Sequence, residues 1–315
     1  MVREVIIGSL TQDLIQDHGD VVTIDARMHG CPGVTAVYYL PAPRPVLIET
    51  GPASSLARVL EGLAEAGVER LDRIVVTHIH LDHAGAAGHL SQRYPEARVV
   101  VRAEGASHLV DPTRLWASAS RLYEDMEGLW GRMLPVHPDR IEPVASDGVV
   151  ADLGDGRELV AFHAPGHARH QMALFESRRR DLFVGDALGV YLPRTMINRP
   201  ATPPPDFHLE AGLDTLERLA ALEARRVFPT HFGPLPDPHG AFGEAARNLR
   251  RWVAVAEEVA RSGGRLAEVV AALQAEDEPL GLDPESLERL DQATDHSLDA
   301  KGILRYLTKH RGLDL

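Results

Sequence analysis

The first part of the chain alternates short apolar runs with stretches rich in glycine, proline and charged residues. Apolar runs bounded in this way predict β-strands. Between them, residues 53–66 place Leu56, Val59, Leu60 and Leu63 on one helical face, which predicts an amphipathic helix. The strands that we expect in this part are 5–7, 21–24, 34–40, 46–49, 74–76 and 98–102.

The pattern changes twice further along the chain. A helical pattern covers residues 103–140, and its Trp, Met and Leu side chains are typical of core packing, with the wall of a pocket as the alternative. Strands and one helix (209–222) follow, and from Gly243 on the pattern is helical throughout. We therefore expect an α/β domain over residues 1–240 with a helical insert at 103–140, and a helical extension over 241–315. The expected later strands are 149–150, 158–162, 171–175, 182–184 and 227–229, and the expected C-terminal helices are 249–259, 266–273, 284–293 and 298–308.

Composition and charge restrict the class of protein. The chain has 315 residues, of which 44% are hydrophobic and 25% are charged, as in ordinary globular proteins that bury a sizeable core. Its net charge of -13 argues against a grip on nucleic-acid backbones. The single cysteine, Cys31, excludes a disulfide within the chain, and no apolar stretch approaches the roughly 18 residues of a membrane span. We expect a cytoplasmic protein with no nucleic-acid or membrane partner.

The densest candidate chemistry lies in residues 77–83, which read T-H-I-H-L-D-H and follow the apolar run 74–76. His78 and His80 are two apart in an extended segment, so their side chains can point the same way. Asp82 and His83 lie past the strand end, where the turning chain can aim them at a second point nearby. Imidazole suits zinc and iron, and a carboxylate completes or bridges such a site. A polar loop with ordinary hydrogen-bonded histidines is the alternative, but this density favours metal binding.

Three later segments each place one further metal-type residue at the end of an expected strand: His167 in P-G-H, Asp186 in G-D and His231 in T-H. A lone histidine after a strand is usually structural. Together with the first motif and in this order, however, the residues resemble the metallo-β-lactamase-fold hydrolase superfamily over roughly residues 1–240. The pattern is similar to the glyoxalase II-like and lactonase-like branch. Classical β-lactamases place a cysteine in the second site, whereas Cys31 lies far upstream here.

This resemblance implies an αββα sandwich with two metal ions at one edge, between the two sheets. It implies two divalent ions per chain, with zinc expected first and iron or manganese as alternatives. Carried over residue by residue, it assigns His78, His80 and His167 to the first ion, Asp82, His83 and His231 to the second, and Asp186 to the position between them.

The resemblance also implies a reaction, in which a hydroxide held by the two metals attacks a carbonyl group. Asp82 or Asp186 would accept or pass on the proton. Tyr191 is a candidate for polarising the carbonyl, as a tyrosine does in some related lactonases, although their spacing is shorter. Glu49 stands where the family often has Asp, and we expect it to orient a neighbouring loop.

Two further candidates are weaker. We expect His170 at the surface or behind a ligand rather than on the substrate. Arg194 could bind a substrate carboxylate, but an exposed position is the expectation.

The helical insert predicts a substrate with an apolar portion and a hydrolysable carbonyl, and thioester, lactone and ester all stay open. The C-terminal helices would close the pocket, form the face of a homodimer or simply cap the core.

Four other functions compete: a metal-dependent phosphodiesterase or nuclease, an iron-dependent persulfide dioxygenase, a flavodiiron enzyme and a non-catalytic metal-binding protein. The net charge argues against the nuclease, the complete second site against the mononuclear dioxygenase, and the full ligand set against a non-catalytic protein.

Overall fold

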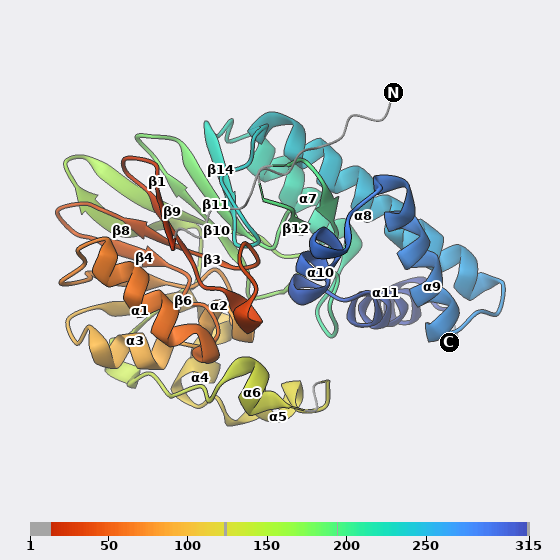
Figure 1. Cartoon of the computed structure of the whole chain (residues 1–315), viewed down its shortest axis with the longest axis horizontal. Helices are drawn as coiled ribbons and strands as arrows, with labels where there is room; N and C mark the ends of the chain where they lie inside the picture. Colours follow the sequence, from red (N-terminus) through yellow and green to blue (C-terminus); the bar gives the residue numbers. More distant parts are fainter. Residues whose placement is uncertain (1–13, 123–124, 194, 314–315) are drawn as a thin grey trace.

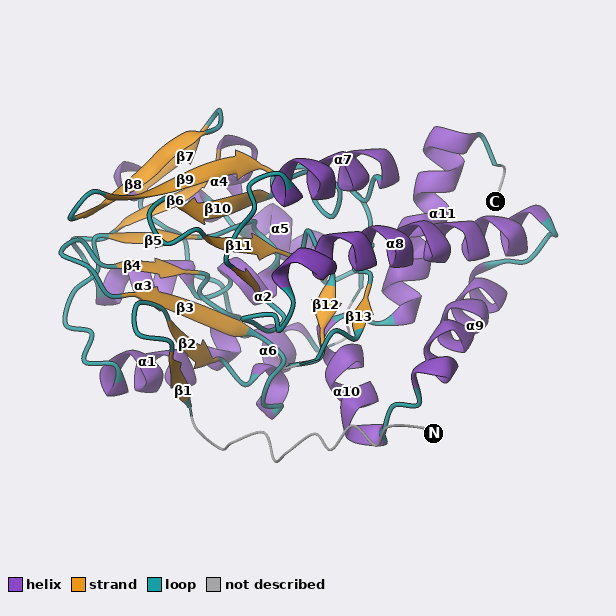
Figure 2. Cartoon of the chain, turned by 90° about the horizontal axis from the view of Figure 1, so that it is seen from above, coloured by secondary structure: helices purple, strands orange, loops and turns teal. Residues whose placement is uncertain are grey.

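The computed structural model describes residues 14–122, 125–193 and 195–313. Two β-sheets face each other, and helices cover their outer faces (Figure 1, Figure 2). This confirms the expected α/β sandwich. The first sheet has the strand order β1 (Ile15–Asp17), β2 (Val22–Asp25), β3 (Ala36–Leu40), β4 (Val46–Ile48), β5 (Arg73–Val75), β6 (Arg98–Arg102) and β7 (Ile141–Val144).

The second sheet has the strand order β14 (Arg226–Pro229), β11 (Asp181–Gly185), β10 (Met172–Glu176), β9 (Arg157–His163) and β8 (Gly148–Gly154). A small ribbon, β12 (Val190–Tyr191) and β13 (Asn198–Arg199), lies apart from both sheets. Strands β4 to β7 run parallel, as do β11 and β14. The carboxyl ends of β4, β5, β11 and β14 therefore bring the segments that follow them to one edge of the sandwich.

Alternation along the strands fills two separate cores. Val75 and Val100 point between the sheets, where they pack in one cluster with Leu174 and Phe183 of the second sheet. Their neighbours Ile74 and Val99 point the other way, into a core shared with the outer helices α1 (Leu56–Glu65), α3 (Ala87–Arg93) and α4 (Ala103–Val110). Because successive side chains point to opposite faces of a strand, both faces of β5 and β6 are buried.

The helical insert divides between core and surface. Met126 and Trp130 of α6 (Met126–Trp130) are buried in the core that α1 also fills, as the apolar stripe predicts. No residue of α5 (Thr113–Ala119) is fully buried. The insert is followed directly by strand β7, which the pattern did not indicate because its sequence, I-E-P-V, contains a proline.

The C-terminal helices form a packed group with a core of their own. It contains Trp252 of α8 (Pro238–Arg261), Leu273 of α9 (Leu266–Asp277) and Ile303 of α11 (His296–Arg311), while α10 (Pro284–Ala293) lies against β12. Helix α8 begins at Pro238 rather than at 249, since the side chain of Asp237 caps its first turn. The same helix covers the second sheet together with α7 (Leu209–Ala220), so it crosses the expected boundary at 240; the division into two domains stays a prediction.

Two further expectations concern the start of the chain and membrane-spanning helices. The expected strand 5–7 lies outside the described residues. Among the helices that are described, none combines the length and apolarity that crossing a membrane requires.

Candidate metal centre

The H-x-H-x-D-H motif spans the junction between β5 and the short helix α2 (Leu81–Ala84). His78 and His80 lie in the connecting segment, and the backbone at His80 is extended. Asp82 and His83 lie on the first turn of α2 rather than in an open loop, because the helix begins directly after His80. The bend between strand and helix aims the two pairs of side chains at two neighbouring points.

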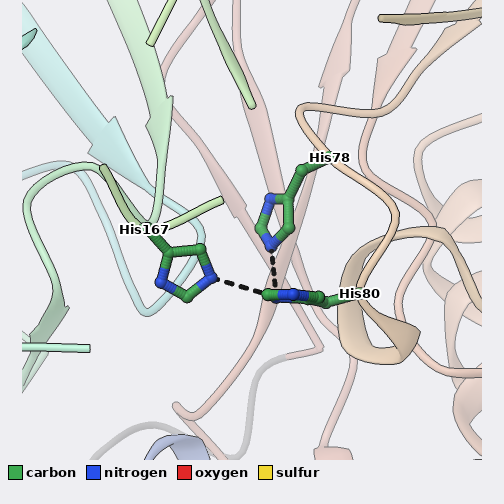
Figure 3. A group of neighbouring side chains, drawn as sticks. All are labelled: His78, His80 and His167. Atoms are coloured by element: carbon green, nitrogen blue, oxygen red, sulfur yellow. Dashed lines mark hydrogen bonds between the residues drawn. The ribbon is translucent and has the colours of Figure 1, made fainter. Parts of the chain in front are cut away.

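One cluster, the first group, consists of His78, His80 and His167. His80 Nδ1 lies 3.0 Å from His78 Nε2 and 3.0 Å from His167 Nε2 (Figure 3). His167 reaches this point from the loop between β9 and β10. Three ring nitrogens that converge in this way cannot all hydrogen-bond to one another, but together they can hold a cation.

A second group consists of Asp82, His83 and His231, the last from the segment after β14. Asp82 Oδ2 lies 3.3 Å from His83 Nε2 and 3.3 Å from His231 Nε2. Asp186, after β11, lies between the groups: its Oδ1 is 3.3 Å from His83 Nε2, and its Oδ2 is 3.5 Å from His167 Nε2. The structure thus brings together every residue that the sequence assigned to the two metals. Their roles as ligands stay a proposal.

Unpaired polar atoms test whether these residues fit a metal. The Nε2 atoms of His83 and His231 and the Oδ1 atom of Asp186 are buried; carboxylate and imidazole atoms lie 3.3 to 3.7 Å away, but no contact among the described residues has the geometry of a hydrogen bond. Buried polar atoms are normally paired, so three that face the same space need an explanation. A divalent cation that takes imidazole nitrogen and carboxylate oxygen supplies it, and the donor set fits zinc, iron or manganese.

The two groups also differ in the protonation that they favour. Burial and the neighbouring imidazoles hold the pKa of His78 and His80 well below the ordinary value, so both rings are neutral. Burial opposes charge on His83 as well, but the surrounding carboxylates, Asp186 first, outweigh it and raise the pKa of His83. The same balance raises the pKa of His231 to about 10. A positive charge is therefore favoured among the carboxylates of the second group.

Backbone carbonyls and one carboxylate hold the outer nitrogens of three histidines of the cluster. His231 Nδ1 donates to the carbonyl oxygen of Val34 at 2.8 Å, and His167 Nδ1 donates to that of Ala201 at 3.0 Å. Because a carbonyl oxygen only accepts, Nδ1 of each ring carries a proton, and in the neutral form of the ring the lone pair lies on Nε2. The rings are thus fixed with a metal-binding atom toward the cluster.

Glu49, which follows β4, has the corresponding role for His83. Its carboxylate is fully buried and accepts from His83 Nδ1 at 3.0 Å, from Thr77 N and Oγ1 at 3.1 and 2.5 Å, and from Thr230 Oγ1 at 2.9 Å. Thr77 precedes His78, and Thr230 precedes His231. The carboxylate therefore holds both ends of the 77–83 motif and the 230–231 segment, which carry candidate ligands, and so it orients the neighbouring loop as expected.

A cavity of about 390 Å³ opens beside the cluster. His80, Asp82, His167 and Asp186 line one part of it, and the insert, the 201–206 segment and the C-terminal helices line the rest. His170 also lines it; its side chain is mostly buried, and this burial is the main reason why its pKa is lowered to about 4 and its ring is neutral. Closure of the pocket was one of the roles that the sequence left open for the C-terminal helices, but it did not single out Ala293 and Leu298, which carry no local signal of a binding site.

The structure gives Tyr191 a partner away from the cluster. Its side chain is buried, and its hydroxyl donates to the carbonyl oxygen of Ala241 on α8 at 3.1 Å. A role for this hydroxyl in polarising a substrate carbonyl stays a prediction. Arg194, the candidate for binding a substrate carboxylate, lies outside the described residues.

Comparison with known families adds to this geometry. The sequence profile described as "Metallo-beta-lactamase superfamily" matches residues 31–231. The chain is 29% identical over 210 residues to the metallo-beta-lactamase fold-containing protein ST1585 of Sulfurisphaera tokodaii, covering 64% of this chain and 74% of that protein. It is 31% identical over 171 residues to the acyl-coenzyme A thioesterase MBLAC2 of Bos taurus, covering 50% of this chain and 55% of the thioesterase.

Solved structures show the same fold. The crystal structure of ST1585 from Sulfolobus tokodaii aligns with a TM-score of 0.66 at 22% identity, over 90% of this chain and 98% of that one. The metallo-beta-lactamase family protein TTHA1429 of Thermus thermophilus aligns with a TM-score of 0.66 at 21% identity, over 88% and 89% of the two chains. Both alignments extend beyond residue 231 and so include part of the C-terminal helices.

Proposed function

Because the chain belongs to the metallo-β-lactamase superfamily, we propose that it is a metal-dependent hydrolase of a small carbonyl substrate, an acyl thioester first and an ester or lactone as alternatives. The observation that carries this proposal is the complete set of His and Asp side chains beside a cavity whose wall is partly apolar. The thioester comes first because a thioesterase is among the relatives of the chain, although the match spans only about half of that enzyme.

The proposed cofactor is a pair of divalent ions, zinc in the first place. The first group would hold one ion, the second group the other, and Asp186 would lie between them. When bound, such ions supply Lewis acidity toward water and toward a carbonyl oxygen.

The protein contributes orientation and proton transfer. The hydrogen bonds from His167 and His231 to backbone carbonyls keep both Nε2 atoms directed at the cluster before a substrate arrives. The carboxylates of Asp82 and Asp186 line the cavity, so either can take the proton that water loses as it attacks the carbonyl. The apolar part of the wall would contact the rest of the substrate.

The charges around the cavity favour this substrate class over a phosphodiester. Two arginines line it, Arg114 and Arg169, but so do the carboxylates of Glu104 and Asp206, and Arg169 Nε lies 3.4 Å from Asp206 Oδ2. A surface that grips a polyanion needs an excess of cations. The proposal therefore includes no nucleic-acid partner.

Metal content and hydrolysis, measured together, test the proposal. Elemental mass spectrometry of the purified protein should find about two ions per chain, and a panel of acyl thioesters, esters, lactones and a phosphodiester should show carbonyl cleavage. His78→Ala and Asp186→Ala should lose metal and activity together, whereas the exposed His239→Ala should keep both. One iron per chain, cleavage of the phosphodiester alone, or an unchanged Asp186→Ala variant would each overturn it.

A further inference from the structure

We infer that the cavity holds the acyl chain of the substrate between helix α5 of the insert and helices α10 and α11 of the C-terminal part, so that these two walls select the length of the chain. This inference rests on the proposed function and deepens it. It assigns a substrate-binding role to two segments outside the metal-type motifs.

Two parts of the cavity lining correspond to the two parts of an acyl substrate, although Glu104, Arg114, Arg169 and Asp206 line the cavity as well. One part of the lining consists of the candidate metal ligands His80, Asp82, His167 and Asp186, and a carbonyl group would react there. Much of the remaining wall is apolar and includes side chains from the insert, the proline-rich segment and the C-terminal helices, namely Leu115, Ala119, Leu122, Trp130, Pro203, Pro204, Pro205, Ala293 and Leu298. A molecule with a carbonyl at one end and a hydrocarbon tail satisfies both parts at once.

Helix α5 shows an apolar surface that the protein covers only in part, since Leu115 and Ala119 also pack against the core that α1 fills. None of its residues is fully buried, yet Leu115 and Ala119 line the cavity, and Leu122 just after the helix is 41% exposed. The two other large apolar residues with comparable exposure in the described part of the chain, Val149 and Leu280, lie away from this cavity. Covering Leu122 and its neighbours with hydrocarbon removes apolar area from water, which favours an acyl chain over a polar group.

Another part of the wall comes from the far end of the sequence. Ala293 ends α10, and Leu298 lies in the first turns of α11. The insert helices lie below the sheets in the view of Figure 1, whereas α10 and α11 lie beside them. Two small residues, Ala119 and Ala293, thus line the cavity from different segments, and a larger side chain at either one would shorten the space available.

The size of the cavity fits a chain rather than an acetyl group. A volume of about 390 Å³ falls within the range of roughly 300–1,000 Å³ that is usual for small-molecule sites. Each methylene that is buried against an apolar wall increases the affinity for the transition state by about fourfold. We therefore expect kcat/KM to rise along a series of acyl thioesters from acetyl to decanoyl.

Substitution of the two alanines tests the inference on the metal-loaded protein. Ala119→Phe and Ala293→Phe should each lower kcat/KM for the decanoyl thioester by about tenfold or more, and leave the acetyl thioester within about twofold. Ala117→Phe is the matched control, since Ala117 lies on the same helix, is exposed and does not line the cavity. Equal rates along the series, together with equal behaviour of Ala119→Phe and Ala117→Phe, would overturn the inference and leave the proposed hydrolase standing.

A binding measurement separates the inference from the proposed function. Fluorescence of cis-parinaric acid, a fatty acid that brightens in an apolar site, reports occupancy without any hydrolysis. Displacement of this probe gives the apparent Kd of decanoate. We expect this Kd to be about tenfold lower for the wild type than for Ala119→Phe or Ala293→Phe. If this holds while no acyl compound is hydrolysed, the acyl site stands and the proposed function fails; if neither fatty acid binds to the wild type, the acyl site is wrong.

Discussion

The two groups of the histidine cluster are held by different parts of the molecule. In the second group, the outer nitrogens of His83 and His231 bond to Glu49 and to the carbonyl of Val34, both from the first sheet and the segments next to it. In the first group, His167 bonds to the carbonyl of Ala201, in a segment outside both sheets. The second group is therefore supported from within the sandwich, whereas the first group depends through His167 on a segment outside both sheets.

The segment that supports His167 is itself held by the C-terminal helices. Thr202 donates from its backbone N to Asp299 Oδ1 at 2.5 Å and from its hydroxyl at 3.1 Å, and Thr294 Oγ1 donates to Asp299 Oδ2 at 2.8 Å. Helix α11 approaches so closely that a Cβ on Gly302 would collide with the carbonyl oxygen of Thr202. Residues beyond 240 thus position a residue that is proposed to bind metal, and the helices do more than cap the core.

Removal of the Glu49 carboxylate should have the largest effect. Glu49→Ala leaves the Nδ1 atom of His83 and the donors of Thr77 and Thr230 unpaired in a fully buried place. We expect a loss of about 5 kcal/mol in the free energy of unfolding, measured by urea denaturation of the metal-free protein. Glu61→Ala, on the exposed face of α1, is the control and should change little. A loss below about 1 kcal/mol would show that the second group does not depend on this carboxylate.

Disruption of the contacts that support the first group should have the second-largest effect. Arg199 is buried and pairs with Asp277, and its Nη1 atom lies 2.6 Å from Asp291 Oδ1. Arg199→Met removes the arginine from the buried carboxylate of Asp277, which keeps only the hydrogen bond from His296 Nε2 at 3.1 Å among the described contacts, and should cost about 4 kcal/mol. It should also lower the metal content from about two ions to about one, since only the first group loses its support. Equal loss of both ions would contradict the separation between the groups.

Much of this arrangement follows from the sequence, and the part that does not has a physical reason. The motifs around His78, His167 and His231 are local, and each lies at the end of an apolar run, so their convergence at one sheet edge could be predicted. Asp299 lies in the first turn of a helix, where acidic residues are common for electrostatic reasons. Its complete burial results from the docking of α11 on the 198–205 segment, and no local pattern encodes that docking.

The pH dependence of stability should show the titration of the buried Asp299 carboxyl group. Burial raises its pKa to about 6, against 3.8 for an unperturbed aspartate, although Arg199 and the bonds from Thr202 and Thr294 work the other way. The folded protein therefore holds this proton more tightly, so the contribution of Asp299 to stability is complete below pH 3.8 and is lost as the pH rises through about 6. The loss amounts to about 3 kcal/mol. Asp299→Asn keeps an acceptor for Thr202 without the charge, so its stability relative to the wild type should rise by about that amount between about pH 4 and pH 7 in urea unfolding. A constant difference over this range would show that Asp299 does not titrate there.

The smallest expected effect concerns Tyr191, which tests whether the cluster extends beyond the two groups. Its buried hydroxyl donates to the carbonyl of Ala241, and burial raises its pKa, so it stays protonated. Tyr191→Phe removes one neutral hydrogen bond and should cost about 1 kcal/mol in the free energy of unfolding. Because this bond already occupies the only proton of the hydroxyl, we expect kcat for an acyl thioester to change by less than about twofold.

Tyr39→Phe is the control for this substitution, since it removes the hydroxyl of a half-buried tyrosine on β3 that does not line the cavity. It should leave kcat unchanged. If kcat of Tyr191→Phe instead falls about tenfold or more while its metal content is unchanged, the hydroxyl must turn from Ala241 toward the substrate. The role predicted for Tyr191 from the sequence would then be right, and the reacting centre would extend from the two groups to the ribbon β12.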